Sequence, residues 1–235
     1  MEAFSQLIVP AFLLVLAGYL IGSLNFSIIL TRLVSREDIR SKGSGNAGAT
    51  NVLRSVGKRA ALFTFIFDFL KCVLSILIGY YAFRYVCEKN GLSLLLIPIG
   101  KYAAGIGCML GHIKPLYFHF KGGKGVTTAA ALVLLLDWRV FIPAFSTFLI
   151  VFAVKKIVSL SSIIGMGLYP VYTFLVMYLF DYKGSPLETG GNLSMPYILC
   201  ITLASALIGG IIVVAHHSNI GRLRRGEEKP ISFRS

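Results

Sequence analysis

The polar stretch from Gly43 to Arg54 (Gly-Ser-Gly-Asn-Ala-Gly-Ala-Thr-Asn-Val-Leu-Arg) combines residue types that bind anions. Its glycines allow backbone N–H groups to turn toward a ligand, and hydroxyl and amide side chains stand beside them. The arginine at its end can bind a phosphate through two parallel hydrogen bonds. This segment, which we name the first glycine stretch, therefore predicts an anion site, with phosphate as the simplest ligand.

Three further polar segments interrupt the apolar chain. Lys121-Gly122-Gly123-Lys124-Gly125, named the second glycine stretch, again places glycines beside fixed cations. A serine-rich segment runs from Ser159 to Ser162, and His216-His217-Ser218-Asn219 follows the last apolar run. A neutral histidine at His216 is suited to take a proton or to orient a hydroxyl. His112 and His119 are expected to be structural.

Several other chemistries do not fit these patterns. The sequence contains no GxxxxGK[ST] motif, no acidic cluster suited to Mg²⁺ and no His/Glu spacing suited to zinc. We therefore expect no nucleotide hydrolysis, no cofactor and no metal. The cysteines have no CxxC spacing and are expected to be buried packing residues; they are Cys72, Cys87, Cys108 and Cys200.

Composition indicates the environment of these segments. The chain has 235 residues, of which 56% are hydrophobic and 14% charged, whereas soluble domains carry about 25% charged residues. Its apolar runs are long enough to span a bilayer and do not alternate as barrel strands do. We expect a single all-α, polytopic membrane domain over residues 1–235. The net charge of +13 is explained largely by inner loops, without any nucleic-acid partner.

The elements that must position the polar segments are seven expected spans. The fourth has only eleven uncharged residues, about 16 Å of helix, so we expect it to start inside the membrane at the second glycine stretch. Its positive N-terminal end would then face a bound anion. The expected spans are Leu7–Leu33, Ala60–Tyr85, Leu92–Leu110, Val126–Leu136, Trp138–Val154, Ile163–Phe180 and Pro196–Ala215, with a hydrophilic loop from Asp181 to Pro196.

Two pairs inside these spans suggest helix contacts. Gly18 and Gly22 form a GxxxG pair, which permits close approach of another helix. Asp68 and Lys71 lie on one helical face, and because charges are costly in lipid we expect a structural ion pair that faces protein or water. For Asn25, an interhelical hydrogen bond and a role at the polar site are equally good interpretations.

The distribution of basic residues predicts the topology. With an outside N-terminus and seven spans, 17 of the 23 Lys and Arg residues lie on the inner side, as the positive-inside rule requires. The N-terminus lacks the features of a cleaved signal peptide. All four polar segments then share the cytoplasmic side.

Taken together, the polar segments resemble the PlsY family, the bacterial membrane glycerol-3-phosphate acyltransferases that use acyl phosphate. The resemblance rests on Gly43–Arg54, on Gly111-His112-x-x-Pro115 followed by Phe120–Val126, on Val158–Ile163, and on His216-x-x-Asn219-Ile220-x-Arg222-Leu223 with Glu228. It implies transfer of a fatty acyl group from acyl phosphate to the sn-1 hydroxyl of glycerol 3-phosphate, in phospholipid biosynthesis at the bacterial inner membrane. The partners are then acyl phosphate, glycerol 3-phosphate and membrane lipids.

This interpretation assigns the candidate residues. The candidate catalytic residues are Ser44, Arg54, Lys121, Lys124, His216 and Asn219. The candidate substrate-binding residues are Gly43, Gly45, Asn46, Thr50, Asn51, Gly122, Gly123, Gly125, Ser159, Ser162, Arg222 and Glu228. Glu228 is expected to brace the basic tail rather than to act as a base, and the His-x-x-x-x-Asp motif of another acyltransferase class is absent.

The same residues also allow two functions other than catalysis. A phosphate or organophosphate transporter would also use glycines and basic residues within the membrane, but it should show inverted repeats, and none is apparent. A lipid-binding scaffold explains basic loops but not Ser44, Asn46 or His216. Glycine pairs also serve plain helix packing, which is the simplest interpretation of either glycine stretch taken alone.

Overall fold

The computed structural model describes residues 2–183 and 193–231, and these residues form helices and connecting segments without any strand. Most of the loop expected at Asp181–Pro196 lies outside the described residues, as does Arg234 of the basic tail. The chain divides into two compact units, Met1–Leu136 and Asp137–Ser235, which are described separately below. The assignment of one domain to residues 1–235 stays a prediction.

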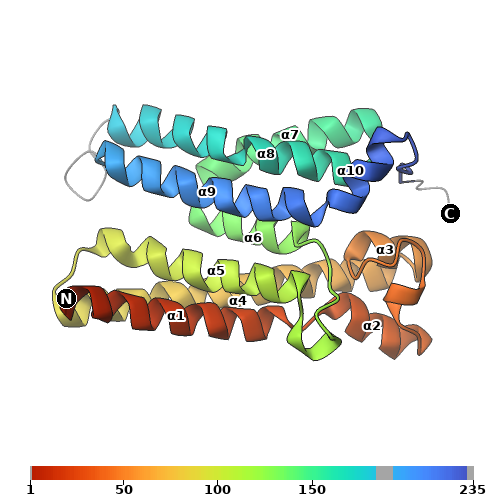
Figure 1. The fold of residues 1–235 in the computed structure, drawn as a ribbon, viewed down its shortest axis with the longest axis horizontal. Helices are drawn as coiled ribbons and strands as arrows, with labels where there is room; N and C mark the ends of the chain where they lie inside the picture. The colour runs from red at the N-terminus through yellow and green to blue at the C-terminus, as the bar shows by residue number, and fades with distance from the viewer. Residues whose placement is uncertain (1, 184–192, 232–235) are drawn as a thin grey trace. The chain divides into compact units, whose positions relative to one another are not determined.

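The first unit is built around three long helices that lie side by side, α1, α4 and α5 (Figure 1). The α-helices of this unit are α1 (Glu2–Gly22), α2 (Phe26–Ser35), α3 (Ala49–Ser55), α4 (Lys58–Asn90), α5 (Ile97–Ile113) and α6 (Val126–Leu136). Short 3-10 turns occupy Ile39–Ser41, Leu94–Leu96 and Leu116–Phe118.

The second unit contains α7 (Trp138–Lys155), α8 (Val158–Val176), α9 (Met195–Ala215) and α10 (His217–Arg224), and a π-helical segment, Met177–Tyr182, extends α8. α8 packs against both α7 and α9 (Figure 1). The serine-rich segment at Ser159–Ser162, expected between two spans, lies instead in the first turns of α8.

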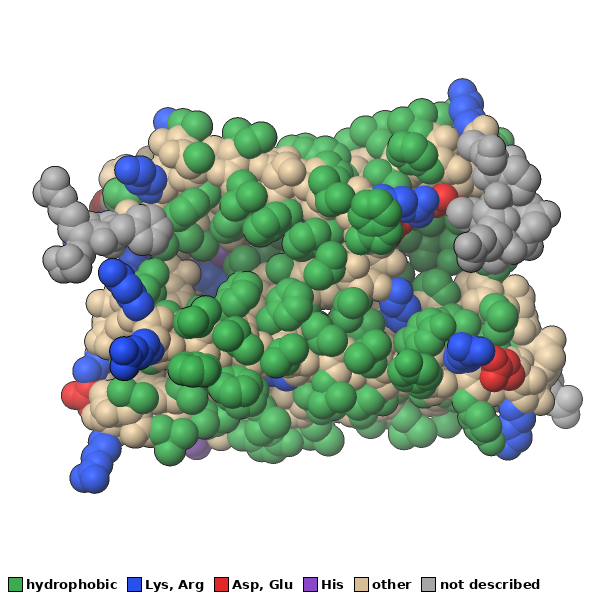
Figure 2. Space-filling model, turned by 180° about the vertical axis from the view of Figure 1, so that it is seen from behind, with side chains coloured by type: hydrophobic (Ala, Val, Ile, Leu, Met, Phe, Trp, Pro, Cys, Tyr) green, Lys and Arg blue, Asp and Glu red, His purple; other side chains and the backbone are tan. Residues whose placement is uncertain are grey.

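Six helical stretches among the described residues are long and apolar enough to cross a membrane: Gln6–Ser35, Lys58–Asn90, Leu94–Phe118, Trp138–Lys155, Val158–Tyr182 and Met195–Ala215. α6 is shorter, with 11 residues, and its bounds are those expected for the fourth apolar segment. Large hydrophobic side chains remain exposed along the helices of each unit, while Lys and Arg gather mostly toward the helix ends (Figure 2). This pattern is typical of helices whose outer faces contact lipid.

Glycines allow α1 and α5 to pack backbone against backbone. A Cβ atom on Gly18 would lie 2.2 Å from the Ala104 carbonyl oxygen, and one on Gly22 would lie 2.0 Å from the Cys108 carbonyl oxygen. Neither position can hold a larger residue without separating the helices. The predicted close helix contact at the GxxxG pair is confirmed.

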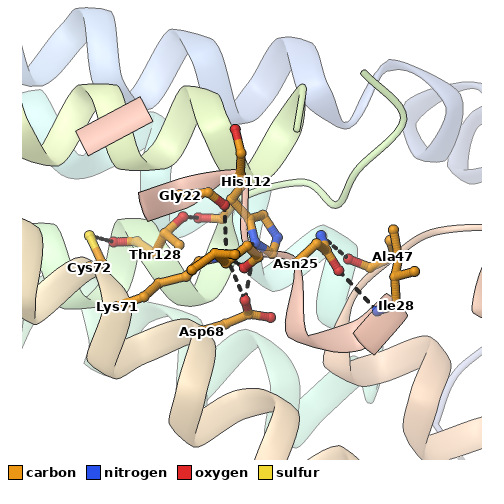
Figure 3. Close-up of polar contacts among 12 residues, drawn as sticks. Gly22, Asn25, Ile28, Ala47, Asp68, Lys71, Cys72, His112 and Thr128 are labelled. Carbon is orange, nitrogen blue, oxygen red and sulfur yellow. Dashed lines mark hydrogen bonds and ion pairs between the residues drawn. The ribbon is translucent and has the colours of Figure 1, made fainter. Parts of the chain in front are cut away.

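The first expected span is not one continuous helix, because α1 ends at Gly22 and α2 begins at Phe26. The Asn25 side chain caps α2 by accepting a hydrogen bond from the Ile28 N–H at 3.2 Å. The Lys71 ammonium donates to the carbonyl oxygens of Gly22 (2.9 Å) and Leu24 (2.6 Å) (Figure 3). A break at membrane depth requires such partners, since lipid offers none to the freed carbonyls.

The predicted ion pair within α4 is confirmed. Lys71 Nζ lies 2.7 Å from Asp68 Oδ1, and both side chains are almost fully buried in protein. The charges therefore avoid lipid, as their cost in hydrocarbon requires.

Candidate active site

The first glycine stretch is folded around the buried side chain of Asn51. Its Nδ2 donates to the carbonyl oxygens of Lys42 (2.9 Å) and Asn46 (3.1 Å), and also approaches that of Ile39 at 3.2 Å. Its Oδ1 accepts a hydrogen bond from the Ser44 N–H at 3.0 Å. The Asn51 amide is therefore engaged with the loop backbone, and it shapes the stretch from within.

Gly43 is required by this arrangement. Its φ of +55° lies in the left-handed region, and a Cβ there would lie 2.3 Å from Asn51 Oδ1. The result is a tight, exposed turn at Gly43, Ser44 and Gly45, while Asn46 and Thr50 are partly buried.

Arg54 does not lie in a loop. It sits in the last turn of the short helix α3, which begins at Ala49, and its side chain is exposed. Sequence patterns did not predict this helix, because seven residues between two glycine-containing turns carry too little periodicity.

The second glycine stretch runs between the 3-10 turn at Leu116–Phe118 and α6. A Cβ on Gly122 would lie 2.1 Å from the His112 carbonyl oxygen, and one on Gly123 would lie 2.3 Å from His112 Nε2. Gly125 ends the stretch with a φ of +78° and leads directly into α6. The predicted helix start immediately after the glycines is confirmed.

The two glycine stretches meet in the first unit. A Cβ on Gly123 would lie 2.5 Å from the Ala47 carbonyl oxygen, so the two backbones are in direct contact. A cavity of about 430 Å³ lies at this junction and is lined by Arg40, Gly45, His119, Lys121 and Gly122. Glycine backbone and cationic side chains line one concave surface, which suits an anion of phosphate size.

Arg40 was missed by the sequence analysis, which counted it only as a charge. Its Nη1 donates to the carbonyl oxygens of Phe118 (2.7 Å) and Lys121 (3.2 Å), so it ties the two stretches together. Its Nε and Nη2 bind the two carboxylate oxygens of Asp38 at 2.9 and 2.8 Å. These hydrogen bonds from Arg40 hold the pKa of Asp38 well below its usual range, against the partial burial that would raise it.

His119 was also missed as a lining residue, and its backbone is unusual. His119 and Phe120 both have a φ of +57°, in the region that favours glycine, immediately before Lys121. Strained backbone of this kind is concentrated at functional sites. The sequence signal available was only the position of His119 next to the lysines.

In the second unit, Glu228 gathers three of the predicted site residues. Its Oε1 accepts hydrogen bonds from Ser159 Oγ (2.7 Å) and Asn219 Nδ2 (2.6 Å), and its Oε2 accepts from Arg222 Nε (2.6 Å). Burial raises the pKa of Glu228, but these three donors outweigh burial and hold the pKa below its usual value. Glu228 contacts Arg222 of the basic tail and links α8, α10 and the following segment, and its role as a brace rather than a base stays a prediction.

The remaining candidates of this unit are Ser162 and His216, each with a contact to a carbonyl oxygen one turn earlier. Ser162 Oγ donates to the Val158 carbonyl oxygen of its own helix at 2.8 Å. His216 is buried where α9 ends, with Nδ1 2.7 Å from the Ile212 carbonyl oxygen, which orients the ring. If Nδ1 donates to that carbonyl, the neutral ring keeps Nε2 as a proton acceptor.

Among the residues that the structure describes, no three His, Cys, Asp or Glu side chains lie together as a metal site would require. The expectation that no cofactor or metal takes part stays a prediction.

The fold and the site together define a class: a polytopic, helical membrane protein with two glycine-rich cationic stretches that meet at one cavity. The sequence matches the family described as glycerol-3-phosphate acyltransferase over residues 12–226. The chain belongs to this family and is an acyltransferase that acts on glycerol 3-phosphate.

Curated relatives named glycerol-3-phosphate acyltransferase match nearly the whole chain. That of Prochlorococcus marinus (strain NATL2A) is 37% identical over 219 residues, which cover 93% of this chain and 97% of the relative. That of Clostridioides difficile (strain 630) is 34% identical over 231 residues, covering 98% of each.

Two solved structures are also similar, both of the integral membrane glycerol 3-phosphate acyltransferase PlsY (YgiH). Its glycerol 3-phosphate form is 32% identical with a TM-score of 0.70, covering 94% of this chain and 96% of that one. Its lysophosphatidic acid form is 30% identical with a TM-score of 0.73, covering 94% and 95%. The transporter alternative finds no support in these comparisons.

Proposed function

We propose that this acyltransferase takes its acyl group from acyl phosphate and transfers it to the sn-1 hydroxyl of glycerol 3-phosphate. The products are 1-acyl-glycerol 3-phosphate and inorganic phosphate. The observation that carries the proposal is the junction of two glycine-rich, cationic stretches in one unit. Two phosphate-bearing substrates require two sets of backbone N–H groups and cations, and each stretch supplies one.

In the first glycine stretch, we assign phosphate binding to Ser44, Asn46, Thr50 and Arg54. The exposed turn at Gly43 and Gly45 makes the Ser44 hydroxyl accessible to a ligand, and the exposed Arg54 guanidinium can bind two phosphate oxygens at once. Asn51 supports this set from within, because its amide is engaged with the loop backbone.

In the second glycine stretch, Lys121 and Lys124 supply point charges, and the N–H groups of Gly122 and Gly125 supply directional donors. The α6 N-terminus begins at the end of this stretch, and its partial positive charge favours the same anion. Either substrate's phosphate has the chemistry that this set recognises.

The roles of the second-unit residues rest on the sequence motif and on local geometry. We assign to His216 and Asn219 the orientation of the attacking hydroxyl, which their ring nitrogen and amide can hydrogen-bond. Ser159 and Arg222 act through Glu228. Its carboxylate accepts hydrogen bonds from both of them and from Asn219, and so fixes the positions of all three side chains.

The reaction balances without a covalent enzyme intermediate. The sn-1 oxygen forms a bond to the acyl carbonyl carbon, and the bond from that carbon to the phosphate oxygen breaks. The departing phosphate takes the hydroxyl proton. Fixed cations then stabilise the charge that develops on the phosphate, which is the largest contribution that such a site can make.

We further propose that the chain crosses the bacterial inner membrane seven times with its N-terminus outside and its polar segments at the cytoplasmic face. Supporting this are the bias of Lys and Arg and the six long apolar helices beside the short α6. Fusion of an alkaline phosphatase or fluorescent reporter to each loop tests the topology, and a reporter that is active outside when fused after Arg54 would overturn it.

The deciding assay for the reaction uses purified protein in detergent with labelled glycerol 3-phosphate and palmitoyl phosphate. We expect lysophosphatidate and phosphate to form in equal amounts. Palmitoyl thioester in place of palmitoyl phosphate is the control and should give no product. Product from the thioester alone would refute the proposed donor.

A further inference from the structure

A buried polar cluster stands directly behind the two glycine stretches. Asp68 and Lys71 come from α4 and His112 from α5, and all three residues are at most 6% exposed (Figure 3). Lys71 Nζ lies 2.7 Å from Asp68 Oδ1 and 3.2 Å from His112 Nδ1, and His112 Nδ1 lies 3.4 Å from Asp68 Oδ1.

The far side of the His112 ring faces the second glycine stretch. A Cβ on Gly123 would lie 2.3 Å from Nε2, so this ring edge fills the space beside the glycine. The Gly123 N–H also donates to the His112 carbonyl oxygen at 3.1 Å. His112 thus holds the stretch through both its backbone and its ring.

The first glycine stretch reaches the same point. The Ala47 carbonyl oxygen lies against Gly123, and Asn25 Nδ2 donates to it at 3.4 Å (Figure 3). Lys71, through its bonds to Gly22 and Leu24, fixes the helix break from which Asn25 extends. One ammonium group therefore supports both stretches by two separate routes.

The ion pair fixes the orientation of the ring. Lys71 Nζ at 3.2 Å and Asp68 Oδ1 at 3.4 Å both lie beside the same ring nitrogen, Nδ1. The other ring nitrogen, Nε2, is thereby turned toward the second glycine stretch.

Stability alone does not account for such a cluster. A buried ion pair is often no more stabilising than apolar side chains of the same volume, and in a membrane segment it is costly. What an apolar replacement could not supply is a fixed orientation of His112 against the glycines.

We propose that Asp68, Lys71 and His112 are positioning residues for phosphate binding by the second glycine stretch. The inference rests on the proposed function, which makes this stretch a phosphate-binding element. It adds a support that acts through the loop and touches no substrate.

The test compares two variants with one control. His112→Asn keeps a polar group near Lys71 but removes the ring edge beside Gly123. The double variant Asp68→Asn/Lys71→Met leaves no unpaired charge but removes the support of the ring. Ser75→Ala is the matched control, since Ser75 is buried one turn along α4 and its hydroxyl donates to the Lys71 carbonyl oxygen at 2.9 Å rather than to the Lys71 side chain.

KM and kcat are measured for glycerol 3-phosphate and for palmitoyl phosphate, each with the other saturating. We expect both test variants to raise the KM of one of the two substrates about tenfold or more, as for displacement of a binding loop by part of an ångström. The KM of the other substrate should change less than about threefold, because its phosphate is bound by the first glycine stretch. Ser75→Ala should keep wild-type values.

Two results would overturn the positioning role of Asp68, Lys71 and His112. If the double variant folds and has wild-type KM values, the ion pair is structural only. If it fails to fold, the pair serves stability, and the positioning role is equally overturned. Lys121→Ala is run in parallel: unchanged KM values there would refute the phosphate-binding stretch itself, and so separate failure of the proposed function from failure of the positioning role.

Discussion

Replacement of Asn51 by aspartate tests the internal organisation of the first glycine stretch. Asn51 is 2% exposed, and its amide makes two strong donor contacts, to Lys42 and Asn46, and accepts one from the Ser44 N–H. At a net value of about 1 kcal/mol for each hydrogen bond, Asn51→Ala should cost about 3 kcal/mol. The amide is isosteric with a carboxyl, so shape alone would predict little change for Asn51→Asp.

The hydrogen bonds of Asn51 predict instead that Asn51→Asp is the more destabilising of the two substitutions. Asn51→Asp keeps the acceptor for Ser44 but turns a second oxygen toward carbonyl oxygens that need a donor. A buried charge without a partner costs more than a lost neutral hydrogen bond, so the aspartate variant should be less stable than the alanine variant. Both should lose turnover, because the turn at Ser44 is no longer held.

Stability is measured by unfolding each variant with SDS in mixed micelles. Acyltransferase turnover is measured for the untreated protein and again after refolding. Ser55→Ala is the control on the same helix, since its hydroxyl makes only a long contact of 3.5 Å to Asn51. Wild-type stability of Asn51→Asp, or a smaller loss than for Asn51→Ala, would refute the donor assignment.

Three further predictions concern the glycines, the arginine and the carboxylate. Gly123→Ala should abolish turnover and lower thermal stability, because backbone and ring atoms lie within 2.5 Å of the added methyl; Gly167→Ala on α8, where nothing lies within 4 Å, should be neutral or stabilising by about 1 kcal/mol. Arg54→Ala should cut turnover on the order of 100-fold, whereas Arg59→Ala at the start of α4 should not, and equal effects would remove the special role of Arg54. Because the pKa of Glu228 is held below 4.5, its stabilising contacts are fully present above that pH and are lost as pH falls through the lowered pKa. In thermal scans, Glu228→Gln should therefore be less stable than wild type at pH 7. As the pH is lowered, the variant should lose less further stability than wild type does. Equal losses of stability with falling pH in the two proteins would contradict the lowered pKa of Glu228.

Local patterns were sufficient for much of the fold. Apolar runs predicted the positions of the long helices, because lipid requires long helices with satisfied backbones. The glycine pair at Gly18 and Gly22 indicated a close helix contact, and the short apolar run after Gly125 indicated a helix that starts at the glycines. These features depend on residues close together in the chain.

Other features depended on contacts between distant segments. The break after Gly22 is supported by Lys71, 49 residues away, in addition to the local cap that Asn25 provides for α2. The serine-rich segment was expected as a connection but is helical, and its first serine, Ser159, donates to Glu228, 69 residues away.

The sequence by itself determined the class of protein, the two glycine stretches and the residue types available for phosphate. Only the tertiary structure decided which polar groups line the cavity and which support the loops. Asn51 and His112 carry side chains that could bind substrate, yet one is engaged with the loop backbone and the other is packed against Gly123. The physical reason is that a hydrogen bond or a steric contact is a property of two positions, and the second position is fixed only when the chain has folded.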